Sequence, residues 1–296
     1  MQFHLIKEIK EIFYRMCFIT LGIITFIAFL EMKFFADSLK STLFHVVTIS
    51  IVIILYVLYK RFNKTKNKIQ NKYYKPITIS LYSKAFIVFI AIFIQTMIES
   101  HFSSDTANQR LIEKNDEGLS MATVFVGGSL TAPIIEEIIF RGVLFITILS
   151  ASSYLQNKIK TRNDKLGVIS FFIISSVLFG FMHVAKAHDI ENIGGYLVSG
   201  IVLSLVFIFT RDIKTVIAIH MLGNTLSILG RYDYMGIVYL VGIIMIIYIF
   251  IFAIIFQFSK SKVIDDYGDY WKYKFKKYRA KKKINYQKDM LKTTFK

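Results

Sequence analysis

Long apolar runs separated by short polar segments are the main pattern of this chain. Several runs approach the roughly 20 residues that a helix needs to cross the hydrocarbon core of a bilayer. The pattern therefore predicts an all-α, polytopic membrane protein with about eight transmembrane helices. The eight runs cover residues 16–30, 43–59, 81–98, 121–149, 167–182, 195–209, 215–229 and 235–258.

The charges between the runs predict the orientation of the chain. Segment 60–75, after the second run, holds seven Lys and Arg residues and no acidic residue, whereas segment 99–117, after the third, holds five acidic residues. Basic segments also follow the fourth, sixth and eighth runs. Since Lys and Arg concentrate in cytoplasmic loops, this alternation predicts eight spans with both termini in the cytoplasm.

Composition agrees with a membrane protein and excludes several other classes. Hydrophobic residues make up 54% of the chain, which is incompatible with a disordered polypeptide. The net charge of +17 comes from basic residues that alternate with apolar runs, so we expect contacts with membrane lipid and no nucleic-acid partner. The basic tail 259–296 fits either an interfacial segment on an anionic leaflet or a solvated tail. The single cysteine, Cys17, excludes a disulfide within the chain.

The fourth run contains ionisable residues where lipid disfavours them. Such residues cost about 2.5 to 3.5 kcal/mol at the centre of a membrane helix, so a cluster of them indicates function. Glu137 and Arg141 are four residues apart and share one helix face, whereas Glu136 points away from Arg141. We therefore expect Glu137 to be neutralised by Arg141 and Glu136 to remain available for chemistry. Two glycines followed by Pro133 predict that run 121–149 bends or breaks.

Two further apolar helices carry histidines. His183 lies at the end of the fifth run, and His220 and Asn224 lie four residues apart in the seventh. Taken singly, these residues fit an interfacial histidine and an interhelical hydrogen-bond pair. Taken with Glu136, they supply a general base and donors for a tetrahedral intermediate. Glu136, His183 and His220 could instead ligate zinc.

The three motifs Glu-Glu-x-x-x-Arg, Phe-x-x-x-His and His-x-x-x-Asn, in this order on separate apolar helices, resemble the CPBP family. That family comprises the CAAX prenyl proteases of the Rce1 type and bacterial relatives linked to bacteriocin self-immunity. The resemblance covers residues 118–230. It implies an integral membrane protein, here of a bacterial plasma membrane, with an active site inside the helix bundle.

The resemblance also implies roles for individual residues. Glu136 resembles the catalytic glutamate and His183 its partner on the attacking water, while His220 and Asn224 match the residues around the oxyanion. The supporting residues would be Glu137, Arg141 and Phe179. Both a zinc mechanism and a metal-free glutamate mechanism are compatible with the resemblance. One conflict arises, because the loop charges place His183 near the outer face and His220 nearer the cytoplasmic face.

Two functional hypotheses follow from these observations. The first is an intramembrane endopeptidase that cleaves membrane-presented peptides or proteins. The alternative is a non-catalytic membrane scaffold, either transporter-like or a bacteriocin-immunity protein. The predicted organisation is N-terminal transmembrane helices at 1–117, a catalytic core at 118–230, a last transmembrane helix at 231–258 and a basic cytoplasmic tail at 259–296.

Overall fold

The computed structural model consists of helices joined by short turns and loops in the residues that it describes. No strand occurs among them, so the predicted all-α class is confirmed. The described residues are 2–36, 42–66, 72–75, 77–102, 105–160, 163–258 and 277. Apart from Lys277, the predicted tail 259–296 lies outside the described residues.

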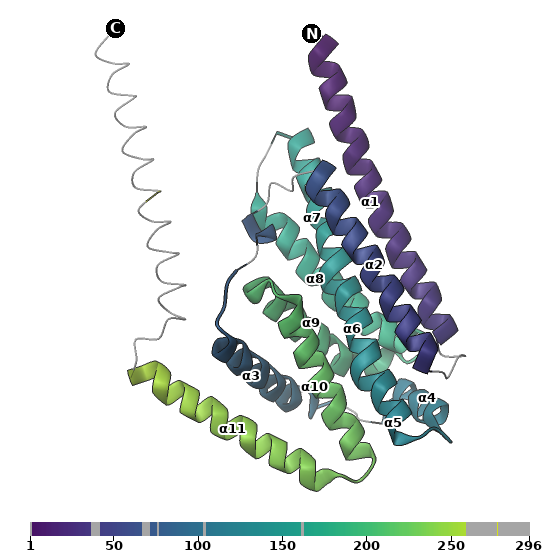
Figure 1. Cartoon of the computed structure of the whole chain (residues 1–296), viewed down its shortest axis with the longest axis vertical. Helices are drawn as coiled ribbons and strands as arrows, with labels where there is room; N and C mark the ends of the chain where they lie inside the picture. Colours follow the sequence, from purple (N-terminus) through teal and green to yellow (C-terminus); the bar gives the residue numbers. More distant parts are fainter. Residues whose placement is uncertain are drawn as a thin grey trace.

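Each of the eight apolar runs falls on helical structure (Figure 1). Seven of the runs form single helices, and a further helix, α4, lies in the segment predicted as the loop after the third run. These helices are α1 (Gln2–Ala36), α2 (Thr42–Lys66), α3 (Leu81–Glu99), α4 (Ala107–Asp116), α8 (Asp164–Ala185), α9 (Ile193–Thr210), α10 (Ile213–Arg231) and α11 (Met235–Phe258). Short 3₁₀ turns are η1 (Lys72–Tyr74) and η4 (Ile190–Asn192).

The fourth run forms one long helical rod of five consecutive segments. Two of the segments are π-helical turns, η2 and η3, and the other three are α-helical. In order, the segments are α5 (Met121–Phe125), η2 (Val126–Thr131), α6 (Ala132–Glu137), η3 (Ile138–Val143) and α7 (Leu144–Lys158).

Among the described residues, five helical segments are long and apolar enough to cross a membrane. They are Leu81–Glu99, Asp164–Ala185, Ile190–Thr210, Ile213–Arg231 and Met235–Ile255. Helix α11 also exposes large apolar side chains, including Ile247 and Phe250, as expected for a surface in contact with lipid. The protein is thus a membrane protein with several apolar helices, while the eight spans and the cytoplasmic termini stay predictions.

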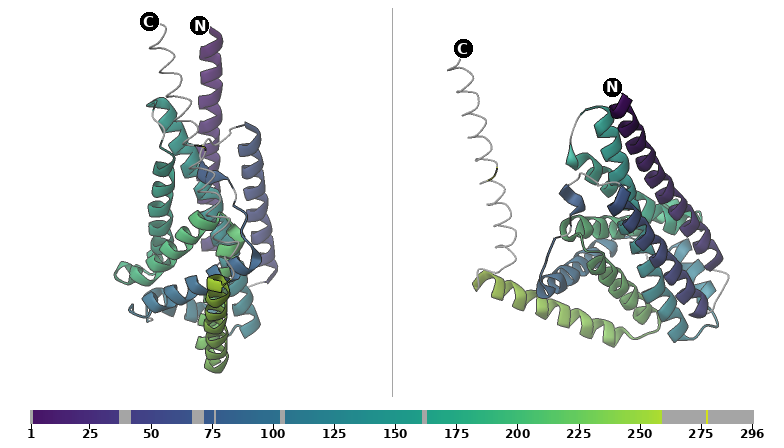
Figure 2. Two further views of the ribbon diagram at one scale, coloured as in Figure 1. Left: turned by 90° about the vertical axis from the view of Figure 1, so that its left-hand side faces the viewer. Right: turned by 45° about the horizontal axis from the view of Figure 1, so that its top comes forward.

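The packing of the helices brings the three motifs together. Helices α1 and α2 lie along the rod, and α8 packs between α7 and α9 (Figures 1 and 2). Helix α10 contacts α3, α9 and the η2 and α6 segments of the rod, and α11 lies against α3 and α10. The rod, α8 and α10, which carry the three motifs, therefore share one packed region.

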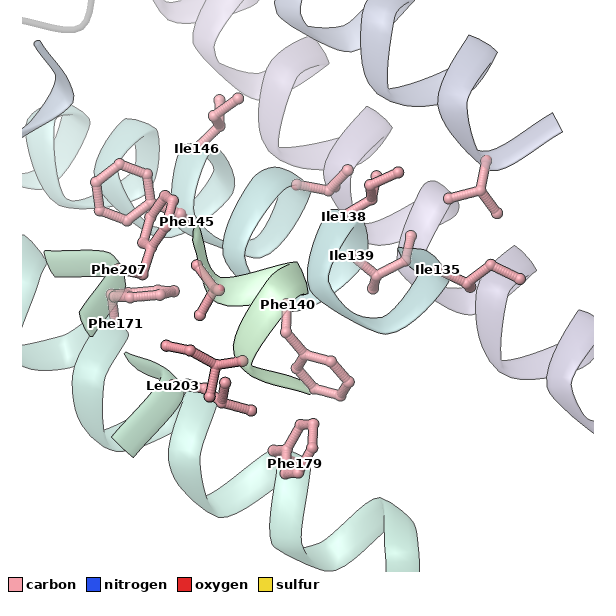
Figure 3. Close-up of a cluster of buried hydrophobic side chains, with 14 of the residues drawn as sticks. Ile135, Ile138, Ile139, Phe140, Phe145, Ile146, Phe171, Phe179, Leu203 and Phe207 are labelled. Atoms are coloured by element: carbon pink, nitrogen blue, oxygen red, sulfur yellow. The ribbon is translucent and has the colours of Figure 1, made fainter. Parts of the chain in front are cut away.

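Aromatic side chains join the rod to α8 and α9 in the core. Phe145, Phe171 and Phe207 meet edge to face, with ring centroids 4.9 to 5.8 Å apart (Figure 3). Phe140 and Phe179 form a second such pair at 5.5 Å. Edge-to-face contacts of this kind add about 0.5 to 1.5 kcal/mol beyond burial alone. This core fixes the position of the rod residues that flank the first motif.

The sequence predicts a bend or a break near Pro133, and the structure places a π-helical turn there. The rod continues through this residue, and the strain is taken up by the π-helical turn η2 directly before it. At the end of that turn the Ala132 N–H donates to the Gly127 carbonyl, five residues back. Proline has no N–H and crowds the carbonyl four residues before it, so a wider turn accommodates it without ending the helix.

An ion pair ties the start of α3 to the connection between α9 and α10. Asp212 caps α10 by accepting hydrogen bonds from the Lys214 N–H (3.2 Å) and the Thr215 hydroxyl (3.0 Å), and it also pairs with Lys84. Partial burial alone would raise the pKa of Asp212. The hydrogen bonds from Lys84 and Thr215 outweigh that effect and hold the pKa below its usual range.

This shift predicts a loss of stability in acid. The pKa of Asp212 is lower in the folded protein than in the unfolded chain, so ionised Asp212 stabilises the fold. This contribution is complete above the unfolded-state pKa of about 4 and is lost as the pH falls through the folded-state pKa. We expect the melting temperature of Asp212→Asn to fall less steeply below pH 4 than that of the native protein. The control is Asp105→Asn, which removes an exposed ion pair with Arg110. The prediction would be contradicted if the melting temperatures of the native protein and of Asp212→Asn fell equally below pH 4.

Candidate active site

Glu137, Arg141 and His220 form a buried network between the rod and α10. Arg141 Nη1 donates to Glu137 Oε1 at 2.9 Å, and both side chains are fully buried. His220 Nδ1 donates to the same carboxylate oxygen, also at 2.9 Å. The predicted pairing of Glu137 with Arg141 is therefore present, and the structure adds His220 to it. One carboxylate thus connects the first motif to the third.

Arg141 also anchors the site to α8 and α9. Its Nη2 donates to the Gly200 carbonyl at 3.2 Å, and its guanidinium lies 4.7 Å from the centre of the Phe179 ring. In addition, the guanidinium interacts electrostatically with Glu136. The sequence assigned Arg141 to Glu137 alone, whereas in the structure this one cation influences both carboxylates.

Glu136 and His183 face each other across the rod and α8. Glu136 Oε2 lies 3.7 Å from His183 Nε2, and Glu136 is 5% exposed. His183 Nδ1 lies 2.8 Å from the Phe179 carbonyl. Since a carbonyl only accepts, Nδ1 carries a proton and donates it to Phe179, while Nε2 faces Glu136. The Tyr196 ring stacks on the imidazole at 4.9 Å and fixes its plane.

The Phe179 ring lies between the two histidines that the loop charges placed at different depths. Its centroid is 4.6 Å from the His183 ring and 5.6 Å from the His220 ring. Figure 3 shows Phe179 pointing towards Phe140 of the rod, and the ring itself is 1% exposed. The packing of α8 against the rod and α10 therefore brings His183 and His220 to a common site.

Asn224 supports the rod at its proline. The Asn224 Nδ2 donates to the Gly128 carbonyl at 2.8 Å. This carbonyl lacks its usual helical donors, because the Ala132 N–H bonds to Gly127 and Pro133 has no N–H. Asn224 thus satisfies an acceptor that the proline leaves open. A primary amide has two N–H groups, so one is left for a second acceptor.

The proposed zinc ligands do not converge as a set of three. Glu136 and His183 face each other, but His220 directs Nδ1 at Glu137. Within the described part of the chain, no group of three or more His, Cys, Asp or Glu side chains is arranged to hold a metal ion. A zinc site at Glu136, His183 and His220 therefore stays a hypothesis that the experiment below tests.

Several residues of the site were not singled out from the sequence. Tyr196, Gly200 and Ser204 of α9 contact His183 or Arg141, but in an apolar run they resemble ordinary packing residues. A side-chain carbon added at Gly200 would lie 2.7 Å from the Ser176 carbonyl. Glycine at this position thus allows α9 to approach α8 and Arg141 to reach its carbonyl.

Comparisons with known proteins agree with the resemblance inferred from the motifs. Residues 118–226 match the family model described as type II CAAX prenyl endopeptidase Rce1-like. Over 99 residues the chain is 31% identical to the membrane-embedded CAAX protease MroQ of Staphylococcus aureus (strain USA300). That match covers 32% of this chain and 34% of the relative, so it spans about a third of the relative's length. No solved structure matches.

Proposed function

We propose that this protein is an intramembrane endopeptidase, because residues 118–226 match the Rce1-like family model of CAAX prenyl endopeptidases. Its substrates are peptides or proteins presented at the membrane, and the products are two shorter chains. His183, His220 and Asn224 lie on two helices that are long and apolar enough to cross a membrane, which fits a reaction at membrane depth. The competing function is the non-catalytic scaffold, and the experiments below distinguish the two.

The short distance between the Glu136 and His183 side chains is the main support for this proposal. A separation of 3.7 Å between Glu136 Oε2 and His183 Nε2 suits a water molecule that donates one hydrogen bond to each atom. With the His183 ring neutral both groups accept, since the carboxylate is an acceptor and the single ring proton lies on Nδ1, bound to the Phe179 carbonyl. A water held in this way has its oxygen lone pairs directed away from both groups and towards a substrate carbonyl.

The reaction that we propose needs only these groups and water. Glu136 takes a proton from the water while the water oxygen attacks the carbonyl carbon of the peptide bond. The carbonyl oxygen becomes an oxyanion. Asn224 and His220 lie on α10 and can donate to it, His220 through Nε2 when its ring carries a proton on both nitrogens. Collapse of this intermediate breaks the C–N bond, and the proton held by Glu136 passes to the leaving amine.

Glu137 and Arg141 position the oxyanion donors. With Nδ1 of His220 bound to Glu137, the other ring nitrogen, Nε2, is the one available to substrate. Arg141 holds the Glu137 carboxylate. We infer that this pair fixes geometry and does not itself exchange protons with substrate.

The predicted effect of Asn224→Ala tests the oxyanion role. Loss of one oxyanion donor lowers kcat by about 10² to 10³ with little change in KM. The control is Thr225→Ala, which removes a hydroxyl that bonds the Met221 carbonyl of the same helix. Turnover and melting temperature are measured on the same purified samples. A melting temperature lowered by Asn224→Ala with native turnover of the folded fraction would show that Asn224 serves only to support Gly128.

Activity after chelation, measured on the same purified protein, distinguishes a metal-free mechanism from zinc-dependent hydrolysis. We expect activity to survive exhaustive chelation, with no stoichiometric metal in the sample. Activity that is lost on chelation and restored by zinc would overturn the metal-free version and return Glu136, His183 and His220 to consideration as ligands.

A further inference from the structure

We propose that Glu99, held by Gln95 and Ser199, forms a subsite that binds a cationic nitrogen of the substrate peptide beside the scissile bond. This inference rests on the proposed peptidase function and adds a substrate class to it. The cation is a Lys or Arg side chain or the free amino terminus of the peptide. Glu99 ends α3 and was interpreted from the sequence only as one of the acidic charges of segment 99–117.

Two hydrogen bonds hold the Glu99 carboxylate in place, and a third joins their two donors to each other. Gln95 Nε2 donates to Glu99 Oε1 at 3.0 Å and to the Ser199 hydroxyl oxygen at 3.1 Å. The Ser199 hydroxyl in turn donates to Glu99 Oε1. All three bonds leave Oε2 uninvolved. The network thus orients a half-buried carboxylate and directs one of its oxygens to a further donor.

This network adjoins the candidate active site through α9. Ser199 lies one turn after Tyr196, which stacks on His183, and directly before Gly200, which binds Arg141. Glu99 also interacts electrostatically with His220. Glu99 is therefore bound to the stretch of α9 that contacts both His183 and Arg141.

The chemistry of this position selects for a positive charge. A carboxylate between apolar helices is poorly solvated, so an opposite charge that reaches it gains more than it would in water. A negative substrate side chain at the same place is repelled, and a neutral one leaves Oε2 without compensation. The subsite therefore favours peptides with one basic group close to the bond that is cleaved.

Binding to a catalytically inactive background tests the subsite separately from peptide cleavage. The probes are fluorescently labelled, N-acetylated apolar peptides in which a single Lys is moved along the chain, with Gln and Glu versions at each position. A Gln peptide with a free amino terminus shows whether the positive charge can come from the terminus instead of a Lys side chain. Affinities are measured for Glu136→Gln and for the double variant Glu136→Gln/Glu99→Gln in lipid nanodiscs, because neither cleaves the probe during the titration.

We expect Glu136→Gln to bind a positively charged probe about tenfold or more tightly than its Glu version, as a close charge pair produces. The additional Glu99→Gln change, which keeps the hydrogen-bonding shape of the side chain, should remove that preference. The matched control is Glu113→Gln, since Glu113 also accepts from a glutamine four residues before it, at 2.9 Å, but on exposed α4.

Three results would overturn the subsite: equal affinity for all probes, a preference for Lys that survives Glu99→Gln, or a preference removed equally by Glu113→Gln. None of them bears on peptide cleavage. Conversely, charge-selective binding through Glu99 combined with no cleavage by the native protein would contradict the peptidase function and leave the subsite standing.

Discussion

Replacing Glu136 with Gln is expected to abolish peptide cleavage while protein abundance and melting temperature stay near native. Gln has the size of Glu but cannot take a proton from water, and loss of a general base costs about 10² to 10⁴ in rate. Folding should tolerate the change, because Arg141 keeps its hydrogen bond to Glu137. Turnover and thermal unfolding of the purified variant check both halves of this expectation.

A control for Glu136→Gln is the same change at the next residue. Glu137→Gln removes the charge that Arg141 and His220 share, so it should lower stability as well as activity. If Glu136→Gln destabilised the protein as much as Glu137→Gln, the assignment of the two carboxylates would be wrong.

Arg141→Ala should have the largest effect on stability, about 3 to 5 kcal/mol, as is typical when one partner of a buried ion pair is removed. The change leaves the Glu137 carboxylate buried without its cation and removes the donor to the Gly200 carbonyl. It also takes away the guanidinium that packs on the Phe179 ring. Denaturation in detergent, or abundance in membranes, measures the loss.

Arg110→Ala is the matched control for Arg141→Ala. Arg110 also pairs with a carboxylate, Asp105, but both side chains are largely exposed. Exposed pairs contribute about 0 to 1 kcal/mol, so this variant should unfold close to the native temperature. Equal effects of the two arginine changes would show that the Arg141 pair is no more important to folding than a surface pair.

Features that depend on local sequence could be predicted. The apolar runs mark the helices, because burial in lipid or protein requires continuous apolar segments. The Glu137–Arg141 pair follows from helix periodicity alone, since residues four apart share a face. The order of the three motifs resembles the family whose model matches residues 118–226.

Features that depend on packing between helices could not be predicted. Loop charges give the side of each helix end but not the tilt, so His183 and His220 seemed separated although both contact the Phe179 ring. The bonds from His220 to Glu137 and from Asn224 to Gly128 each join residues more than 80 positions apart. Nothing in the local pattern specifies such pairs.

The sequence predicts that Pro133 disturbs the rod, but it does not predict the geometry of the disturbance. The missing N–H of this proline does disturb the rod, as expected, but the disturbance is a π-helical turn with a donor supplied by Asn224. Predicting that outcome would have required knowing that α10 lies beside the proline. Whether a helix ends or continues at a proline thus depends on the contacts that a neighbouring helix provides.

A comparison of membrane peptidomes tests the central claim most directly. Cells that lack the native gene are supplied with either the native protein or Glu136→Gln at equal abundance, and their membrane peptides are identified by mass spectrometry. The account predicts fragments present only with the native protein, whose uncut precursors accumulate with Glu136→Gln. Identical peptidomes, together with a cellular function that Glu136→Gln fully retains, would contradict a peptidase and favour the non-catalytic scaffold.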